Sequence, residues 1–184
     1  DNGSTKVSFN STTRVLTDGK LLLTKDASSN HLRLGTFSVA YPDDNFIVEA
    51  DFEAPAENFC PDAKLMAIYT SSPQAVVYMG PAGIRAGASG KLPTLVSRSQ
   101  IVNDKKFNVA LKVNLVNNCY DVYYNRKKIT SSPMSLDGIV SGDARFDGLS
   151  FHVPTLEENG SIYVDNIKAY SGTESCDIGD LRAN

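Results

Sequence analysis

The stretch FNVALKVNLV, residues 107–116, shows most plainly how this chain folds. Its hydrophobic side chains recur at every second position: Phe107, Val109, Leu111, Val113 and Leu115. Successive side chains of an extended strand point to opposite faces, so this spacing gives one apolar face and one polar face. Strands with one face in water are typical of antiparallel sheets. The stretch therefore predicts a strand of an antiparallel sheet.

The same two-residue period recurs along the chain. In residues 45–54, NFIVEADFEA, one face carries Phe46, Val48, Ala50 and Phe52, and the other carries Ile47, Glu49, Asp51 and Glu53. Further strands are expected over residues 21–24, 32–40, 64–70, 75–79, 94–97, 119–124, 149–153 and 161–170. Turn signals such as Asp18-Gly19 and Asn117-Asn118 separate them, and Asn117-Asn118 predicts a tight hairpin. We predict an all-β fold, a two-sheet antiparallel β-sandwich of the jelly-roll type.

The length favours a single domain. The chain has 184 residues, and a sandwich of this size commonly forms one folding unit with its own core. We expect residues 1–172 to form the domain and residues 173–184 to form a polar C-terminal tail.

Charge and hydropathy argue against two classes of partner. The net charge is −3 and the sequence has no Lys/Arg block, which argues against nucleic acid. Its apolar runs are far shorter than a membrane-spanning helix requires, so no membrane span is expected. Two glycosylation sequons, Asn10-Ser11-Thr12 and Asn159-Gly160-Ser161, and a Ser/Thr/Asn-rich, Lys-poor opening favour export. We expect a secreted, cell-surface or periplasmic protein.

Three cysteines leave the disulfide state open. Cys60, Cys119 and Cys176 are too far apart in sequence for a metal or redox motif of the CxxC kind. One disulfide with one remaining thiol and no disulfide at all are equally compatible with this count. If a disulfide forms, we expect Cys60 to pair with Cys119, because Cys176 lies in the polar tail.

Two segments resemble a known superfamily. The hairpin Phe107–Ile129, with Arg126 where glycine is usual, resembles a hairpin of the concanavalin A-like (laminin-G and lectin-like) jelly rolls. The closing strand Gly160–Tyr170 is similar to the last strand of many secreted jelly rolls, in which an acidic or amide pair such as Asp165-Asn166 interrupts the alternation. A β-bulge at this pair would bring Ile162, Val164, Ile167 and Ala169 to one face. The resemblance implies a fold that hosts lectins, hydrolases, lyases and adhesion modules, so it leaves the function open.

One acidic stretch suggests catalysis. Glu49, Asp51 and Glu53 share a strand face and resemble the E-x-D-x-E signature of laminarinase-like glycoside hydrolases. That resemblance implies Glu49 as nucleophile, Asp51 as assisting carboxylate and Glu53 as acid/base. The chain has no Trp to line a cleft, is shorter than those enzymes and has Ala50 where they carry a larger residue. The alternative is an ordinary strand with a solvated acidic face.

A second set of side chains suggests sugar binding. Asp121, Tyr123 and Asn125 share one face of their strand, and Asn114 precedes them across the hairpin. Aromatic rings with amide and carboxylate groups are the usual means of binding a sugar. His152 would join them if its strand were a neighbour in the sheet. The alternative is that the tyrosines are amphipathic residues at the edge of the core.

A structural calcium ion is the one cofactor that the sequence suggests. Asp165 lies in the closing strand, where many jelly-roll modules hold Ca²⁺ with carboxylate and carbonyl oxygens. The alternative is that the chain has no cofactor and that its acidic pairs serve turns.

Three functions remain open on the sequence. The first is a non-catalytic glycan-binding or glycan-associated exported domain, with a polysaccharide or glycan as partner. The second is a glycoside hydrolase using Glu49, Asp51 and Glu53. The third is a structural or adhesion module that binds a protein partner.

Overall fold

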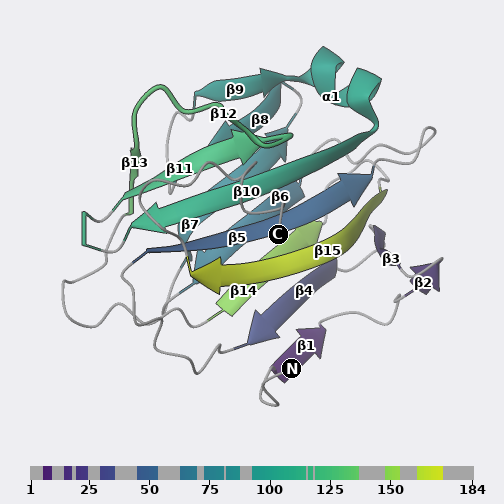
Figure 1. Cartoon of the computed structure of the whole chain (residues 1–184). Helices are drawn as coiled ribbons and strands as arrows, with labels where there is room; N and C mark the ends of the chain where they lie inside the picture. Colours follow the sequence, from purple (N-terminus) through teal and green to yellow (C-terminus); the bar gives the residue numbers. More distant parts are fainter. Residues whose placement is uncertain are drawn as a thin grey trace.

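The computed structural model is a sandwich of two antiparallel β-sheets, one lying behind the other (Figure 1). The structure describes residues 6–9, 15–17, 20–24, 30–35, 45–53, 63–69, 73–80, 82–87, 93–114, 116–117, 119–136, 148–153 and 161–171, some of them by their backbone alone. The predicted fold class, an all-β antiparallel sandwich, is confirmed.

Seven strands form one sheet and eight form the other. In spatial order the first contains β1 (Lys6–Phe9), β4 (Asn30–Gly35), β14 (Gly148–Val153), β6 (Ala63–Tyr69), β7 (Pro73–Gly80), β8 (Gly83–Ala86) and β9 (Thr94–Ser97). The second contains β12 (Lys127–Lys128), β11 (Cys119–Tyr124), β10 (Lys106–Asn114), β5 (Asn45–Glu53), β15 (Ser161–Ser171), β3 (Lys20–Thr24) and β2 (Val15–Thr17), with β13 (Met134–Ser135) paired to β11.

The core lies between the sheets and follows the predicted alternation. From the eight-stranded sheet it receives Phe46, Val48, Ala50, Phe52, Phe107, Val109, Leu111, Val113, Tyr120, Val122, Tyr124, Ile162 and Val164. From the opposite layer it receives Leu65, Met66, Val77, Ile84, Ala86 and Val96. Three rings form a ladder across β5, β10 and β11: Phe52 stacks on Phe107, and Phe107 stacks on Tyr124, each with centroids 5.6 Å apart. This ladder gives the central strands a shared aromatic contact beyond their hydrogen bonds.

The predicted bulge in the closing strand is confirmed. The pairing of β15 with β5 shifts register between Asp165 and Lys168, and Asn166 has a φ of 48°. On either side of the bulge, Ile162 and Val164 are buried in the core and Ile167 packs against it. The extra residue therefore reverses the parity of the strand and keeps apolar side chains on one face.

The structure adds one short helix that the periodicity did not indicate. Helix α1 (Arg98–Asp104) joins β9 to β10, and the side chain of its N-cap Ser97 accepts a hydrogen bond from the backbone N–H of Gln100. It buries only Ile101. Seven residues are too few to show a helical period, but Ser97 followed three residues later by Gln100 fits the capping-box pattern. No helix among the described residues is long and apolar enough to cross a membrane.

Several details of the sequence prediction need correction. Strand β8 (Gly83–Ala86) was not among the expected strands. The connection at Asn117-Asn118 is longer than a two-residue hairpin, because Asn114 and Cys119 are the last paired residues.

Cys119 is a free thiol, and burial is the main cause that raises its pKa. Cys60, Cys176 and the tail 173–184 lie outside the described residues.

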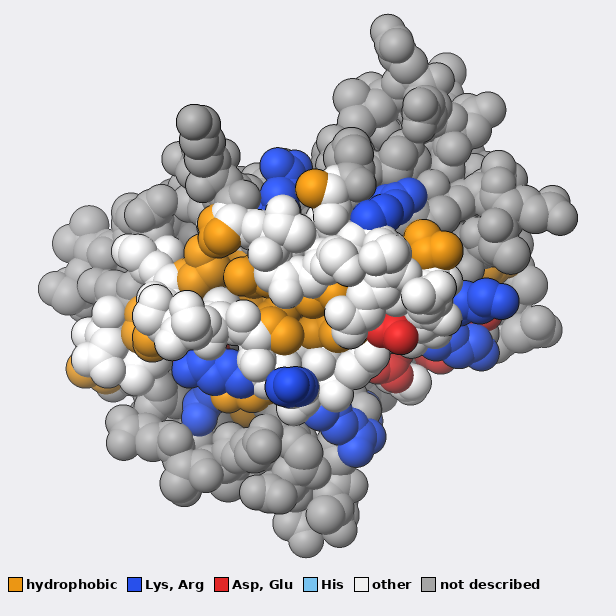
Figure 2. Space-filling view, turned by 90° about the horizontal axis from the view of Figure 1, so that it is seen from above, with side chains coloured by type: hydrophobic (Ala, Val, Ile, Leu, Met, Phe, Trp, Pro, Cys, Tyr) orange, Lys and Arg blue, Asp and Glu red, His pale blue; other side chains and the backbone are white. Residues whose placement is uncertain are grey.

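The described surface is mostly uncharged on the face seen in Figure 2. Lys and Arg side chains lie in separate groups around this face, and acidic side chains gather at one place beside basic ones. Apolar side chains show between polar ones over the middle of the face.

Gly83 provides a test of the packing between β8 and β9. Its φ is 128°, and a Cβ built there would lie 2.0 Å from the carbonyl oxygen of Val96. We expect Gly83→Ala to lower the free energy of unfolding by more than about 2 kcal/mol, because backbone atoms must move and the conformation is unfavourable for alanine. Urea denaturation measures the loss. Ala82→Ser, an exposed substitution one residue away, should change stability little, and an equal effect of both would contradict this account.

Candidate functional site

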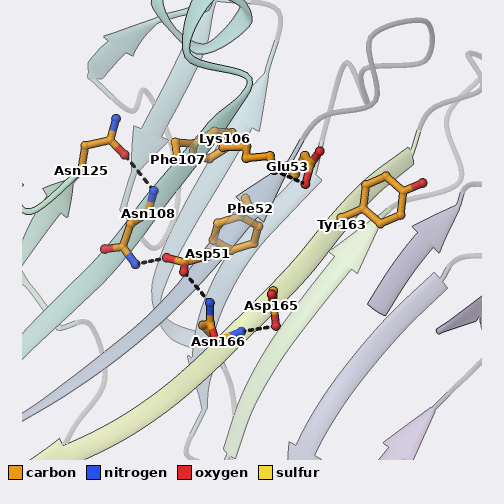
Figure 3. A pocket seen from close by; sticks show the side chains of 10 residues that line it. All are labelled: Asp51, Phe52, Glu53, Lys106, Phe107, Asn108, Asn125, Tyr163, Asp165 and Asn166. Carbon is orange, nitrogen blue, oxygen red and sulfur yellow. Dashed lines mark hydrogen bonds and ion pairs between the residues drawn. The ribbon is translucent and has the colours of Figure 1, made fainter. Parts of the chain in front are cut away.

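A pocket of about 360 Å³ opens on the face of the eight-stranded sheet that points away from the core. Its floor comes from the end of β5 and the start of β10, with β15 on one side and the turn after β11 on the other (Figure 3). The lining residues are Asp51, Phe52, Glu53, Lys106, Phe107, Asn108, Asn125, Tyr163, Asp165 and Asn166. Most of these alternate with core residues, so the strand period that builds the core also builds the pocket.

The carboxylate of Asp51 lies at the centre of the polar contacts. The side-chain amide of Asn108 donates to Asp51 Oδ1 over 2.6 Å, and the amide of Asn166 donates to Asp51 Oδ2 over 2.9 Å. Asn108 is the register partner of Asp51 on β10, whereas Asn166 reaches it from the bulge of β15. Both carboxylate oxygens are therefore held by amides from the two neighbouring strands (Figure 3).

A tight turn brings Asn125 to the pocket. Tyr124 and Lys127 are paired across a two-residue loop in which Asn125 and Arg126 have φ values of 48° and 68°. Positive φ at both positions is the mark of a type I′ hairpin turn. The backbone N–H of Asn108 donates to Asn125 Oδ1, and the backbone N–H of Asn125 donates to the carbonyl oxygen of Asn108, each over 2.9 Å. These two hydrogen bonds therefore attach the turn to β10.

The end of helix α1 supports the same turn. Asp104 Oδ2 accepts a hydrogen bond from the Tyr124 hydroxyl over 2.7 Å and a longer one from the Asn125 amide over 3.4 Å. Burial is the largest cause that raises the pKa of Tyr124, and the hydrogen bond to Asp104 and its charge add to it. The tyrosine hydroxyl therefore keeps its proton and remains a donor to Asp104.

Among the described lining residues, carboxylates outnumber cations. Lys106, the one cation among the described lining residues, lies 3.5 Å from Glu53 Oε2 and is 69% exposed. Asp51 and Asp165 are register partners on adjacent strands and add two further carboxylates. The backbone N–H of Asn166 donates to Asp165 Oδ1 over 2.7 Å. The described part of the lining therefore combines carboxylates with side-chain amides.

Asn108 contributes an acceptor that the described residues do not satisfy. This residue is 7% exposed, and its Nδ2 donates to Asp51 and to the carbonyl oxygen of Ala50. Its Oδ1 is buried and has no hydrogen-bond partner among the described residues. A buried acceptor without a donor is costly, so a ligand that supplied a donor would gain free energy here.

The proposed catalytic carboxylates do not share one environment. Asp51 and Glu53 line the pocket, whereas Glu49 is fully buried and lies between Ala110 and Lys168 in the sheet register. The expectation of a solvated acidic face is thus wrong for Glu49. A nucleophile must contact its substrate, and the Glu49 side chain has no exposed surface with which to do so.

The residues predicted to bind sugar fall into separate places. Asn125 lies in the Asp51 pocket, and Asn114 and Asp121 line a second pocket of about 240 Å³ at the other end of β10 and β11. Tyr123 is only 7% exposed and packs with Ile47 and Ala110. His152 lies on β14, in the seven-stranded sheet, so its strand is not a neighbour of β11.

The second pocket contains a carboxylate that is already engaged. Asp121 Oδ2 lies 2.9 Å from Lys128 Nζ, and Asp121 Oδ1 accepts a hydrogen bond from the Thr130 hydroxyl over 2.8 Å. These contacts tie β11 to β12 and to the segment after it. Asp121 thus has a structural role in the sheet, whatever else it does.

Most of the residues that make the Asp51 pocket were not predicted from the sequence. Asn108, Asn166, Tyr163 and Lys106 were not among the candidates. Asn108 was visible as a polar residue on the wet face of its strand, and Asn166 as the centre of the expected bulge. What the sequence did not show is that the strands of Asn108 and Asn166 flank the strand of Asp51.

The described residues around Asp165 do not by themselves form a calcium cage. No group of three or more His, Cys, Asp or Glu side chains within the described ranges is placed to hold a metal ion. Amide N–H groups already point at both oxygens of Asp51 and at Oδ1 of Asp165, and a cation needs those lone pairs. Calcium at Asp165 stays a prediction that requires further oxygen ligands.

Comparisons with known proteins identify the fold alone. No family model matches the sequence, and no curated protein matches it. Solved structures do match: a botulinum neurotoxin DC binding domain in complex with rat synaptotagmin II (TM-score 0.71, 11% identity, 98% of this chain and 46% of that one) and the same kind of domain in complex with SialylT (0.68, 10%, 97% and 45%). A sialidase matches 83% of this chain with a TM-score of 0.61 at 13% identity.

This chain spans less than half the length of those toxin binding domains and 15% of the sialidase. At such low identity the shared feature is the β-sandwich, a fold found in proteins that bind glycans and in one case a protein. Site residues are not transferable at this distance.

The turn that holds Asn125 offers a stability test outside the pocket lining. Arg126 is exposed and has a φ of 68°, where a non-glycine residue is strained. We expect Arg126→Gly to raise the free energy of unfolding by about 0.5–1 kcal/mol, because glycine adopts this conformation without a steric cost. Urea denaturation measures the change. Lys127→Gly, one residue further on in β12, should lower stability instead, and a loss in both variants would contradict the turn assignment.

Proposed function

We propose that this chain is a non-catalytic glycan-binding domain of an exported protein, built as a concanavalin A-like jelly roll, and that it binds a saccharide in the Asp51 pocket. The observation that carries the proposal is the Asp51 carboxylate held by two amides in a pocket with aromatic and amide lining. Each part of this arrangement matches a feature of sugar chemistry.

Sugar hydroxyls both donate and accept hydrogen bonds. The pocket offers acceptors at Asp165 and Asn166 and a donor at Asn125, and the Oδ1 of Asn108 is a buried acceptor that a donor would satisfy. Tyr163, an aromatic residue of the lining, supplies apolar surface for the C–H face of a sugar. The volume lies at the lower end of the range for small-molecule sites, which suits a short saccharide.

The geometry favours binding over hydrolysis. Glycoside hydrolysis needs two carboxyl groups that both face the scissile bond. Glu49 is fully buried, the two oxygens of Asp51 accept amide hydrogen bonds, and Glu53 is paired with Lys106. With Glu49 buried, the second carboxyl group that the E-x-D-x-E pattern would require has no access to a substrate. These contacts support the non-catalytic reading.

Two of the similar structures support a saccharide as the class of ligand. One toxin domain was solved with SialylT, and the sialidase acts on saccharides as its name states. Another was solved with rat synaptotagmin II, so binding to a protein partner is the alternative function for this chain. Binding to a protein with silence on a glycan array would favour that competitor.

Asn166→Gly tests the proposed site. Glycine accepts the φ of 48° at this position, so the bulge should survive while the amide that holds Asp51 Oδ2 is lost. We expect glycan affinity to fall about tenfold, the effect of about 1.4 kcal/mol, because Asp51 loses one of its two anchors. A glycan array identifies the bound saccharide, and isothermal titration calorimetry with that saccharide measures the loss.

Lys105→Gly is the matched control, because Lys105 has a similar φ of 54° and does not line the pocket. It should leave affinity unchanged. Unaltered glycan binding by Asn166→Gly, with both variants folded, would move the binding site away from this pocket.

Calcium at Asp165 is a separate and minor proposal. If an ion is bound there, a chelator should lower the Tm of the parent chain, and Asp165→Asn should remove that response, because the variant lacks a charged ligand. Thermal denaturation with EDTA and with added Ca²⁺ makes the measurement. The same Tm with EDTA and with added Ca²⁺ would contradict calcium binding at Asp165.

A further inference from the structure

We infer that Asp104, at the C-terminal end of α1, is a positioning residue for the Asp51 pocket, because its carboxylate holds the turn that carries Asn125. Asp104 is not among the lining residues of that pocket, so it acts on the site through other residues. The inference rests on the proposed glycan-binding function and adds to the site a residue of the short helix.

One oxygen atom of Asp104 contacts two consecutive residues of the neighbouring hairpin. Its Oδ2 accepts a hydrogen bond from the Tyr124 hydroxyl over 2.7 Å and a longer one from the Asn125 amide over 3.4 Å. Tyr124 is the last residue of β11 and only 3% exposed, and Asn125 is the first residue of the turn that follows. Because the acceptor is a carboxylate, these bonds are stronger than those between neutral groups. Asp104 therefore fixes the point at which the strand becomes the turn.

Hydrogen bonds continue from this turn to the centre of the pocket. Asn125 Oδ1 accepts from the backbone N–H of Asn108, and the backbone N–H of Asn125 donates to the carbonyl oxygen of Asn108. The side-chain amide of Asn108 then donates to Asp51 Oδ1 (Figure 3). The Asn125 side chain is thus held on one side by β10 and on the other by Asp104. The contact with Asp104 therefore determines how Asn125 is presented to a ligand.

The helix by itself gives no reason for a carboxylate at this position. The C-terminal end of a helix carries a partial negative charge, so an acidic side chain in the last turn is unfavourable. Asp104 is the last residue of α1, and the helix buries only Ile101. Lys105 ends the helix with a φ of 54°, which is uncommon for a residue other than glycine. Both features cost stability, and the contacts of Asp104 with Tyr124 and Asn125 offset that cost.

The expected consequence of losing Asp104 is a less preorganised pocket. Without its carboxylate, the side chain of Asn125 keeps its bond to β10 and loses the one on the other side. A saccharide would then have to order this side chain when it binds, and ordering one side chain lowers affinity about threefold to tenfold. Binding should therefore be weakened rather than abolished.

Amide hydrogen exchange, followed by NMR on the free full chain, tests the positioning directly. We expect Asp104→Ala to speed the exchange of the backbone amides of Asn108 and Asn125 about tenfold, because the turn opens more often. Tyr124→Phe should have a similar effect, since phenylalanine keeps the ring that stacks on Phe107 and loses the hydroxyl. The double variant should exchange little faster than Asp104→Ala alone, because both changes remove the same hydrogen bond.

Isothermal titration calorimetry with the saccharide that the glycan array identifies tests the effect on the site. Asp104→Ala should bind it about threefold to tenfold more weakly. Asp104→Asn should recover most of the loss, because its side-chain oxygen can still accept from the Tyr124 hydroxyl. Asn103→Ala is the matched control: this neighbouring residue of α1 is exposed and does not line the pocket, so the variant should change neither exchange nor affinity.

Two results would overturn the inference and leave glycan binding at this pocket standing. The first is unchanged exchange at Asn108 and Asn125 in Asp104→Ala, which can be measured without any ligand. The second is faster exchange together with unchanged affinity, since the position of the turn would then not matter to the site. Silence of every glycan on the array would instead reject the proposed function, and the role of Asp104 in glycan binding with it.

Discussion

The pairing of β5 with β10 is the constraint on which both the core and the pocket depend. Nine register pairs, from Lys106 and Glu53 to Asn114 and Asn45, align two strands of the same period. In this register Phe52 faces Phe107 inside, and Asp51 meets Asn108 outside. A slip by one residue would send each side chain to the other face. The hydrophobic burial that fixes the register therefore also fixes the amide on the central carboxylate.

A regular neighbour on the other side would not complete that site. β15 is in register with β5 up to Asp165, and there its bulge inserts a residue whose side chain reaches Asp51. The same insertion changes the parity of the strand, so Ile162, Val164 and Ile167 all contact the core. One irregularity thus meets two requirements: apolar packing on one face and a second amide for Asp51 on the other.

The features that the sequence predicted are those encoded within one strand. The alternation in residues 107–116 and 45–54 and the parity change at Asp165-Asn166 are local, and the structure confirms them. The sequence could not show that Asn108 lies beside Asp51, 57 residues earlier, because the order of strands in a sheet depends on long-range packing. For the same reason it could not place His152, which lies in the opposite sheet.

The two-residue pattern also could not predict which side chains on the outer face of the sheet are buried. Alternation assigns Ile47, Glu49 and Tyr123 to the wet side of their strands, yet all three are buried. Period-two patterning says which side of a strand a residue takes and nothing about what covers that side. This is why the acidic triplet looked like one constellation in the sequence while only Asp51 and Glu53 line the pocket.

The backbone conformation at two positions indicates that the side chains of this pocket have been retained for a purpose. Asn125 and Asn166 both have a φ of 48°, where glycine would cost the backbone least. Glycine would leave Asn108 and Asp51 without the contacts that these two side chains make. Asparagine tolerates the left-handed region better than other non-glycine residues and also brings an amide. Its use at both positions fits a site where some backbone strain is retained because the side chain is needed.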